Sequence, residues 1–155
     1  MTRAYLSLGS NVGDRAEHLA VGVRRVAGGD AARLSRVYET EPVGGVAQED
    51  FWNLVLELTT SATPEELWAR ARAAEAARGR VREQHWGPRT LDVDLLIVEG
   101  VTSDDPALTL PHPRMYERAF VLAPLRELAP ELVSEAQLAA GVGRVVALGT
   151  LESLR

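Results

Sequence analysis

Residues 51–79 change from the period of a β-strand to that of a helix within a short distance. In "FWNLVLELTT" the apolar side chains alternate, so one strand face carries Trp52, Leu54, Leu56 and Leu58. "TPEELWARARAAEAARG" then has Thr63 as N-cap, Pro64 at the first helical position and Glu66 to complete a capping box. Gly79 predicts the end of this helix. The junction of a strand and a capped helix indicates a mixed α+β chain.

The remaining apolar patterns place the other elements in a definite order. Strand patterns cover residues 3–9, 32–40 and 91–98. A helical pattern runs from Arg15 to about Ala27, and Asp14 with Glu17 three residues later predicts its start. The order is therefore βαββαβ. It predicts an α+β fold with a ferredoxin-like core, in which helices pack on one face of a mainly antiparallel sheet.

The second half of the chain is less regular. Residues 101–114 predict irregular structure or a short hairpin. Met115 to Leu128 predicts a helix that breaks at Pro124, because proline has no backbone N–H to donate. After Leu132 the pattern assigns neither an element nor a function.

Length and composition indicate one compact domain that spans residues 1–155. Of its 155 residues, 46% are hydrophobic and 25% are charged, as in an ordinary globular protein. No apolar run approaches the roughly 20 residues that cross a bilayer, and the N-terminus lacks the order of a signal peptide. We therefore expect a cytoplasmic protein without a membrane partner. Because the chain has no cysteine, oxygen or imidazole must hold any metal.

The charged residues are unevenly distributed. All 17 basic residues are arginine, which excludes a P-loop lysine and a Schiff-base lysine. The net charge of -5 argues against nucleic-acid binding. Between residues 70 and 89, however, six arginines accompany only two glutamates. This stretch predicts a local anion site rather than a basic face.

Asp92 and Asp94 interrupt an apolar strand in "RTLDVDLLIV". Alternation places Leu91, Val93, Leu95 and Ile97 on one face and the two aspartates, followed by Leu96 and Val98, on the other. Carboxylates near a core are costly unless they are paired or bind a cation, and Mg²⁺ takes carboxylate oxygens together with substrate phosphates. The pattern therefore favours a magnesium site. An exposed strand end, with solvated acids or salt bridges to arginine, is the alternative.

Cationic groups directly precede the aspartates. They are Arg78, Arg80, Arg82, His85 and Arg89. Those beyond Gly79 suit a polyphosphate held by arginine forks, whereas Arg78 is better explained as a solvated helix end. His112, between two prolines in "LPHPR", is restrained enough to present an imidazole. "GSNVG" (9–13) predicts a tight turn rather than a phosphate loop, because it has neither GxGxxG nor lysine.

Several motifs together carry a resemblance to a known family. They are "YLSLGSNVGDR", "ETEPVGG", "FWNLVLEL", "EAARGRVREQHWGPRTLDVDLL" and "LPHPRMYERAFVLAPLRELAPEL". In this order, from Tyr5 to Leu132, they resemble 6-hydroxymethyl-7,8-dihydropterin pyrophosphokinase of folate biosynthesis. The resemblance implies a ferredoxin-like enzyme. It would transfer pyrophosphate from MgATP to the pterin hydroxymethyl oxygen and release AMP.

Matching positions then imply roles for individual residues. Asp92 and Asp94 would bind two Mg²⁺ ions, and Asp94 could also favour loss of the hydroxyl proton. The residues implied for ATP binding are Glu75, Arg80, Arg82, Trp86, Arg89, His112 and Arg118, and those implied for catalysis are Arg80, Arg89 and Asp94. The residues implied for pterin binding are Thr40, Pro42, Val43, Phe51, Asn53 and Phe120. Phe51 and Phe120 would stack on the pterin, and the Asn53 amide would recognise its edge.

Two other functions remain open from the sequence. A ferredoxin-like binding or regulatory module would hold a small ligand or RNA without catalysis, and it would tolerate Asp92→Asn. RNA binding would also require exposed aromatics on a basic sheet, which an acidic chain does not offer. A simple kinase would instead produce ADP. We expect a monomer whose partners are its two small-molecule substrates.

Overall fold

The computed structural model describes residues 1–41, 48–79 and 90–155. Its elements are β1 (Thr2–Ser10), α1 (Arg15–Ala27), β2 (Ala31–Leu34), β3 (Val37–Thr40), β4 (Phe51–Thr60), α2 (Pro64–Ala77), β5 (Asp92–Val98), the 3₁₀ helix η1 (Met115–Glu117), α3 (Ala119–Leu128), the 3₁₀ helix η2 (Pro130–Leu132), α4 (Glu135–Ala140), β6 (Val145–Gly149) and α5 (Leu151–Leu154). The strands lie in the order β5-β1-β4-β3-β6, with β2 also paired to β4. Each of these pairings is antiparallel.

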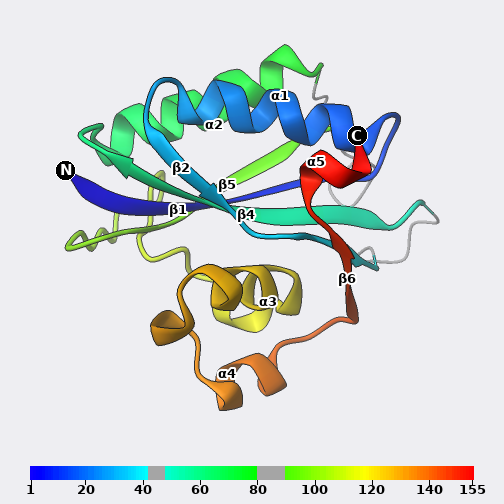
Figure 1. The fold of residues 1–155 in the computed structure, drawn as a ribbon. Coiled ribbons are helices and arrows are strands. Elements are labelled where there is room, and N and C mark those ends of the chain that lie inside the picture. Colours follow the sequence, from blue (N-terminus) through cyan, green and yellow to red (C-terminus); the bar gives the residue numbers. More distant parts are fainter. Residues whose placement is uncertain (42–47, 80–89) are drawn as a thin grey trace.

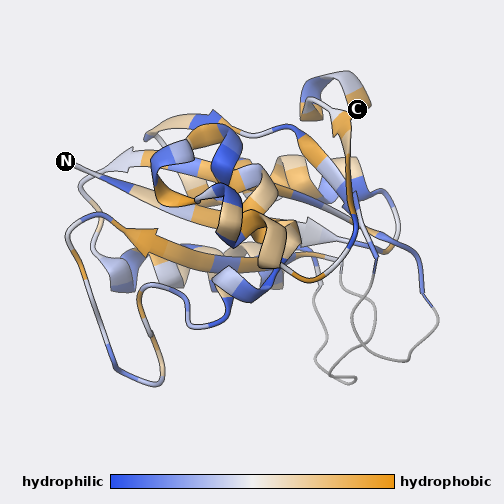
Figure 2. Ribbon diagram, turned by 90° about the horizontal axis from the view of Figure 1, so that it is seen from below, coloured by the Kyte–Doolittle hydropathy of each residue, from blue (hydrophilic) through white to orange (hydrophobic). Residues whose placement is uncertain are grey.

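The predicted ferredoxin-like core is confirmed, and it carries a second layer that the sequence order did not predict. Helices α1 and α2 cover one face of the sheet, while α3 and α4 lie on the other (Figure 1). Leu19 of α1 and Leu67 of α2 pack with Leu56 of β4 in the larger core. Val55 packs with Leu122 of α3 in a second core on the opposite face. Seen from the α3 side, apolar residues follow the strands and the connecting loops are mostly hydrophilic (Figure 2).

The capped helices begin where the sequence predicts. The Asp14 side chain accepts a hydrogen bond from the Glu17 N–H at the start of α1. Thr63 accepts one from the Glu66 N–H at the start of α2. Gly79 follows α2 with φ +71°, a left-handed conformation that suits a helix end.

The single strand predicted for residues 32–40 is wrong, because a bulge divides it into β2 and β3. Leu34 pairs with Leu56 and Tyr38 pairs with Asn53, so the register shifts by one residue between them. Ser35 occupies the bulge and bonds Val55 twice, through its N–H to the Val55 oxygen and through its Oγ from the Val55 N–H, both at 2.9 Å. Because the Ser35 hydroxyl accepts the hydrogen bond of the Val55 N–H, the strand can bend here without leaving that backbone group unpaired.

A second bulge, in β5, corrects the predicted faces of this strand. Leu6 pairs with Leu95 and Tyr5 pairs with Ile97, so Leu96 is the extra residue. Ile97 consequently packs on the α3 side with Leu96, and Val98 joins the core beneath α1 and α2. Simple alternation across Leu96 had assigned both residues to the wrong faces. Before the bulge, Leu91, Val93 and Leu95 share the α1–α2 side as predicted.

Helix α3 does not break at Pro124, contrary to the prediction. Pro124 is buried inside α3, whose apolar side chains pack against the sheet, so tertiary packing outweighs the lost hydrogen bond. The break lies at Arg118, whose backbone is extended. Val142 bonds the chain on both sides of this residue, donating to the Glu117 oxygen at 2.9 Å and accepting from the Ala119 N–H at 3.1 Å.

The chain after Leu132 crosses from one face of the sheet to the other. Strand β6 pairs with β3 at the sheet edge, and α5 then reaches the α1 side (Figure 1). Leu151 enters the larger core, and Arg155 contacts Glu17 of α1 at 2.9 Å. Within the described ranges, the structure contains no helix long and apolar enough to span a membrane.

Candidate active site

Asp92 and Asp94 project from β5 toward the α3 face and are half-buried. They pair across the ladder with Gly9 and Ser7 of β1. Side chains two residues apart in a strand are about 7 Å apart at their Cα atoms. The two carboxylates can therefore contact one ligand from the same face of the sheet.

Arg118 brings a positive charge to these acids. Its guanidinium lies 4.0 Å from Asp94 Oδ2 and also stands over the Phe120 ring, 5.6 Å from the ring centroid. The extended backbone of Arg118 lies just before α3, which carries Phe120 on its first turn. A cation and an aromatic ring thus lie next to one of the carboxylates.

An amide and a hydroxyl occupy the same sheet face two strands away. Asn53 of β4 is buried, and its Nδ2 donates to Thr40 Oγ1 of β3 at 2.7 Å. Thr40 is also buried, so this hydrogen bond holds the amide plane in a preorganised position. The resemblance implied pterin binding for Thr40 but not this contact with Asn53. The Thr40 hydroxyl is a structural contact that the motif did not reveal.

Gly9 separates the acids from the amide. It pairs with Asp92 on one side and with Asn53 on the other. A Cβ at this position would lie 2.4 Å from Asn53 Oδ1 and 3.5 Å from Cδ1 of Phe51. The predicted tight turn at 9–13 is wrong for Gly9 and Ser10, which belong to β1. Two strand spacings put the acids and the amide roughly 10 Å apart across an open glycine.

His112 has one ring nitrogen committed to the backbone. Its Nδ1 accepts from the Arg114 N–H at 3.2 Å, so the neutral ring carries its proton on Nε2. The backbone N–H of His112 donates to the backbone oxygen of Leu96 at 2.8 Å, and this hydrogen bond joins the loop to the bulge of β5. Burial lowers the pKa of His112, and the charges of Arg118 and Arg114 lower it further, while Asp92 acts in the opposite direction. The site holds a neutral imidazole that can donate through Nε2–H.

The lowered pKa of His112 predicts a pH-dependent stability. The unfolded chain binds this proton more readily than the folded chain, so the free energy of unfolding rises as pH increases toward 6.5 and is then constant for this group. His112→Gln should reduce this slope. Some slope will remain, because burial also lowers the pKa of His18. Urea unfolding between pH 5 and pH 7, with NMR titration of the ring, measures both effects. A His112 pKa above 6.5 in the free protein would contradict the argument.

Glu75 lies beneath the edge of β5, at the end of α2. The residue is 3% exposed, and its Oε2 accepts from the Val93 N–H at 2.9 Å. Arg72 lies one helical turn earlier, and its Nε is 3.2 Å from Glu75 Oε1. The resemblance implied ATP binding for Glu75 and gave Arg72 no role; the folded helix shows that both side chains reach the strand.

Six of the predicted site residues lie outside the described residues. They are Pro42, Val43, Arg80, Arg82, Trp86 and Arg89. Apart from Glu75, which lies on α2, the described ones divide into two groups on one sheet face. Asp92, Asp94, His112 and Arg118 gather at β5 and the start of α3, and Asn53 with Thr40 lies at β3 and β4. Phe51 reaches toward Gly9 between the groups, and Phe120 lies beside Arg118.

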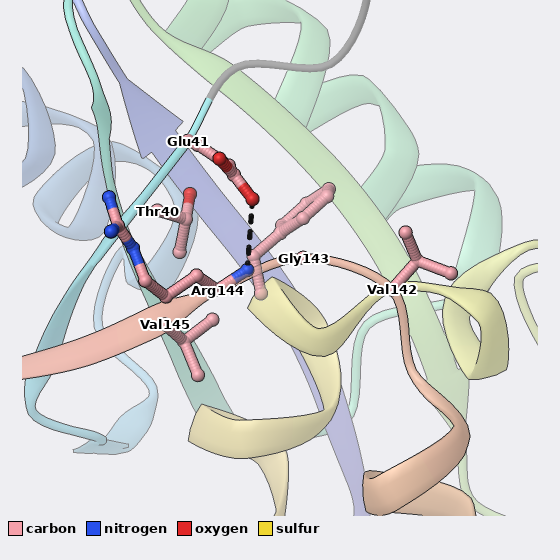
Figure 3. Close-up of a pocket in the computed structure, with 7 residues that line it drawn as sticks. Thr40, Glu41, Val142, Gly143, Arg144 and Val145 are labelled. Carbon is pink, nitrogen blue, oxygen red and sulfur yellow. Dashed lines mark hydrogen bonds between the residues drawn. The ribbon is translucent and has the colours of Figure 1, made fainter.

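A hollow opens beside Phe120 and the end of β3. Its lining includes Thr40, Glu41 and residues 142–145 (Figure 3). The Arg144 N–H donates to Glu41 Oε1 at 3.3 Å, which joins the two sides of the hollow. The chain after Leu132, to which the sequence assigned no function, thus forms a wall next to two of the predicted pterin-binding residues.

The donor set at β5 is compatible with magnesium. Two half-buried carboxylates offer only oxygen ligands, as a hard divalent cation prefers. Among residues 1–41, 48–79 and 90–155, no group of three or more histidines and acids could hold an ion by itself. Mg²⁺ usually keeps several waters and takes phosphate oxygens as further ligands. The residues present therefore fit an ion that arrives with a phosphorylated substrate.

Comparison with known proteins identifies the family to which this arrangement belongs. Residues 5–130 match the model described as 7,8-dihydro-6-hydroxymethylpterin-pyrophosphokinase (HPPK). The chain belongs to the HPPK family. It is 48% identical over 136 residues to the 2-amino-4-hydroxy-6-hydroxymethyldihydropteridine pyrophosphokinase of Methylorubrum extorquens, covering 86% of each chain. The enzyme of the same name from Bacillus subtilis is 43% identical over 136 residues, covering 86% of this chain and 81% of that one.

A solved structure supports the fold of this HPPK family member. The crystal structure of an HPPK-DHPS in complex with substrates has a TM-score of 0.61 and 12% sequence identity. The similarity covers 99% of this chain and 42% of that longer chain. The chain thus spans less than half of the solved protein, and at this identity the likeness concerns the fold alone.

Proposed function

We propose that the chain is a 6-hydroxymethyl-7,8-dihydropterin pyrophosphokinase that acts in folate biosynthesis. The hydroxymethyl oxygen attacks the β-phosphorus of ATP, the bond between this phosphorus and the oxygen of AMP breaks, and AMP leaves with the electron pair. The hydroxyl proton is lost in the same conversion. The proposal rests on one observation: Gly9 of β1 pairs with Asp92 of β5 on one side and with Asn53 of β4 on the other, so one strand lies between the acid and the amide. A flat heterocycle on Asn53 then has its substituent directed toward a phosphate site at Asp92.

At the phosphate site the acids bind metal ions, and the arginines and His112 contact phosphate oxygens. In this proposal Asp92 and Asp94 hold two Mg²⁺ ions, which when bound screen the triphosphate and align it for attack. Arg118 and the Nε2–H of His112 contact phosphate oxygens, and Asp94 favours loss of the hydroxyl proton. Arg80, Arg82 and Arg89 complete the phosphate contacts, with Trp86 nearby in the ATP site, and Arg80 and Arg89 stabilise charge on the transferred and leaving groups. Glu75 supports ATP binding from beneath β5.

The pterin site uses the second group of residues. Asn53, oriented by Thr40, presents a donor and an acceptor to the edge of the heterocycle. Phe51 and Phe120 stack on its two faces, and Pro42 and Val43 contribute backbone contacts beside Thr40. A buried amide of this kind rejects analogues that leave it unsatisfied.

The nucleotide product tests this function. Incubation with MgATP and 6-hydroxymethyl-7,8-dihydropterin should yield AMP, and AMP should appear only when the pterin is present. ADP would identify a simple kinase instead. Binding of both ligands without turnover, using fresh pterin, would identify a binding module. In the proposal the chain acts as a single-domain monomer without a nucleic-acid or membrane partner, and light scattering during turnover would test the monomeric state.

A further inference from the structure

Strand β5 forms one edge of the sheet, yet the outer side of Val93 is bonded. An edge strand ordinarily leaves a row of backbone N–H and C=O groups without a neighbouring strand. Here the Val93 N–H donates to Glu75 Oε2 at 2.9 Å, and an Arg72 guanidinium N–H donates to the Val93 oxygen. Two side chains of α2 therefore take the place of a neighbouring strand at this residue.

Arg72 and Glu75, which we call the clamp, contact each other as well as the strand. Arg72 Nε lies 3.2 Å from Glu75 Oε1, one helical turn along α2. Glu75 is 3% exposed, so water competes little for its carboxylate. The carboxylate and the guanidinium balance each other's charge, so the clamp holds the strand without adding net charge beside the acids.

Val93 is the residue between Asp92 and Asp94. Its N–H belongs to the peptide unit that joins it to Asp92, and its C=O belongs to the unit that joins it to Asp94. The clamp bonds each of these units once. Rotation of either unit would redirect the neighbouring carboxylate, so the two hydrogen bonds restrain the direction of both acids from the opposite side of the strand.

We propose that Arg72 and Glu75 are positioning residues for the metal site formed by Asp92 and Asp94. This inference rests on the proposed function, because it assigns the clamp a role only if the two acids hold Mg²⁺. The clamp acts through the backbone of Val93 and sets the separation and direction of the carboxylates before substrate arrives. Groups that orient metal ligands in this way typically contribute 10- to 100-fold in metal affinity or activity.

The same helix supplies a matched control. Arg70 is as exposed as Arg72, at 30%, and it also pairs with an acid and donates to a backbone oxygen. Its partners are Asp30 and the Val26 oxygen, at the α1 side rather than at β5. Arg70→Met therefore removes a similar set of contacts without touching the strand that carries the two acids.

The test measures the Mn²⁺ affinity of Arg72→Met and of Arg70→Met in the presence of α,β-methylene ATP. Mn²⁺ serves as a spectroscopic probe for Mg²⁺. Arg72→Met should weaken Mn²⁺ binding by roughly 10-fold and increase hydrogen exchange at the Val93 amide. Arg72→Lys, which retains a donor for the Val93 oxygen, should recover part of the affinity. Arg70→Met should bind Mn²⁺ as the parent does. Equal Mn²⁺ affinities in Arg72→Met and the parent, or equal losses in both methionine variants, would overturn the proposal.

A further pair of measurements separates this inference from the proposed function. Asp92→Asn should itself weaken Mn²⁺ binding by at least 10-fold if the acids are ligands. If it does not, the metal site fails and the positioning role falls with it, whatever the nucleotide product. If Asp92→Asn weakens binding and the parent makes AMP while Arg72→Met retains full affinity, only the positioning role is wrong.

Discussion

Asp92→Asn and Asp94→Asn should each reduce kcat by roughly 10³-fold or more. In the proposed function these carboxylates hold the ions that stabilise charge on the triphosphate, a contribution of several kcal/mol, and each 1.4 kcal/mol corresponds to about tenfold in rate. Asparagine keeps the size of the side chain but loses the charge that binds a cation. Steady-state assays of AMP release at saturating pterin, repeated over a range of Mg²⁺ concentrations, measure the effect.

The structure predicts that this loss occurs without unfolding. Both acids are half-buried, and the contact of Asp94 with Arg118 is long at 4.0 Å, so loss of that contact alone should change the free energy of unfolding by at most about 1 kcal/mol. Glu99→Gln, at an exposed acid just beyond β5, is the control for loss of a negative charge near the strand. An Asp92→Asn enzyme with parental kcat would exclude the metal role and favour a binding module.

Gly9→Val should reduce kcat/KM for the pterin by about 10²- to 10³-fold. The first added carbon would lie 2.4 Å from Asn53 Oδ1, so the amide must leave its position. Asn53 is buried and bonded to Thr40, and Phe51 Cδ1 lies 3.5 Å from the added group, so the displaced amide would no longer match the pterin edge. A buried polar site that no longer matches its substrate loses far more than a missing methylene costs.

Two comparisons separate this effect from a general effect of replacing glycine. Gly29 has no atom within 4 Å of an added Cβ, so Gly29→Val should retain parental kinetics. Gly9→Val should raise KM for the pterin while Mn²⁺ binding with α,β-methylene ATP changes little, because the atoms nearest to the added Cβ belong to Asn53 and Phe51. Unchanged kcat/KM in Gly9→Val would contradict the assignment of Asn53 to pterin recognition.

As far as Val98, the local rules of sequence predicted the elements but not where bulges interrupt them. Thr63, Pro64 and Gly79 mark α2 because caps depend on neighbouring residues alone. The bulges at Ser35 and Leu96 depend on the partner strand, so alternation continued through them and misplaced Ile97. Pro124 was misjudged for a related reason, since the packing of α3 on the sheet decides its helix.

Some residues of the candidate site could likewise be predicted from the sequence, and others could not. Asp92 and Asp94 stood out because charge inside an apolar strand conflicts with its surroundings. Gly9 and Arg72 carried no such conflict, since glycine near a turn and arginine on a helix are ordinary. Their importance comes from contacts with residues far along the chain, Asn53 and Val93. Long-range pairing of this kind has no local signature in one sequence.

The alternation of Asp92 and Asp94 with Leu91, Val93 and Leu95 also bears on how the chain avoids misfolding. A slip of β5 by one residue against β1 would turn both carboxylates into the core beneath α1 and α2 and expose the leucines. Burying two unpaired charges would cost several kcal/mol, far more than a slip in a purely apolar strand. The acids proposed as metal ligands therefore discriminate against the wrong register during folding, before any substrate is present.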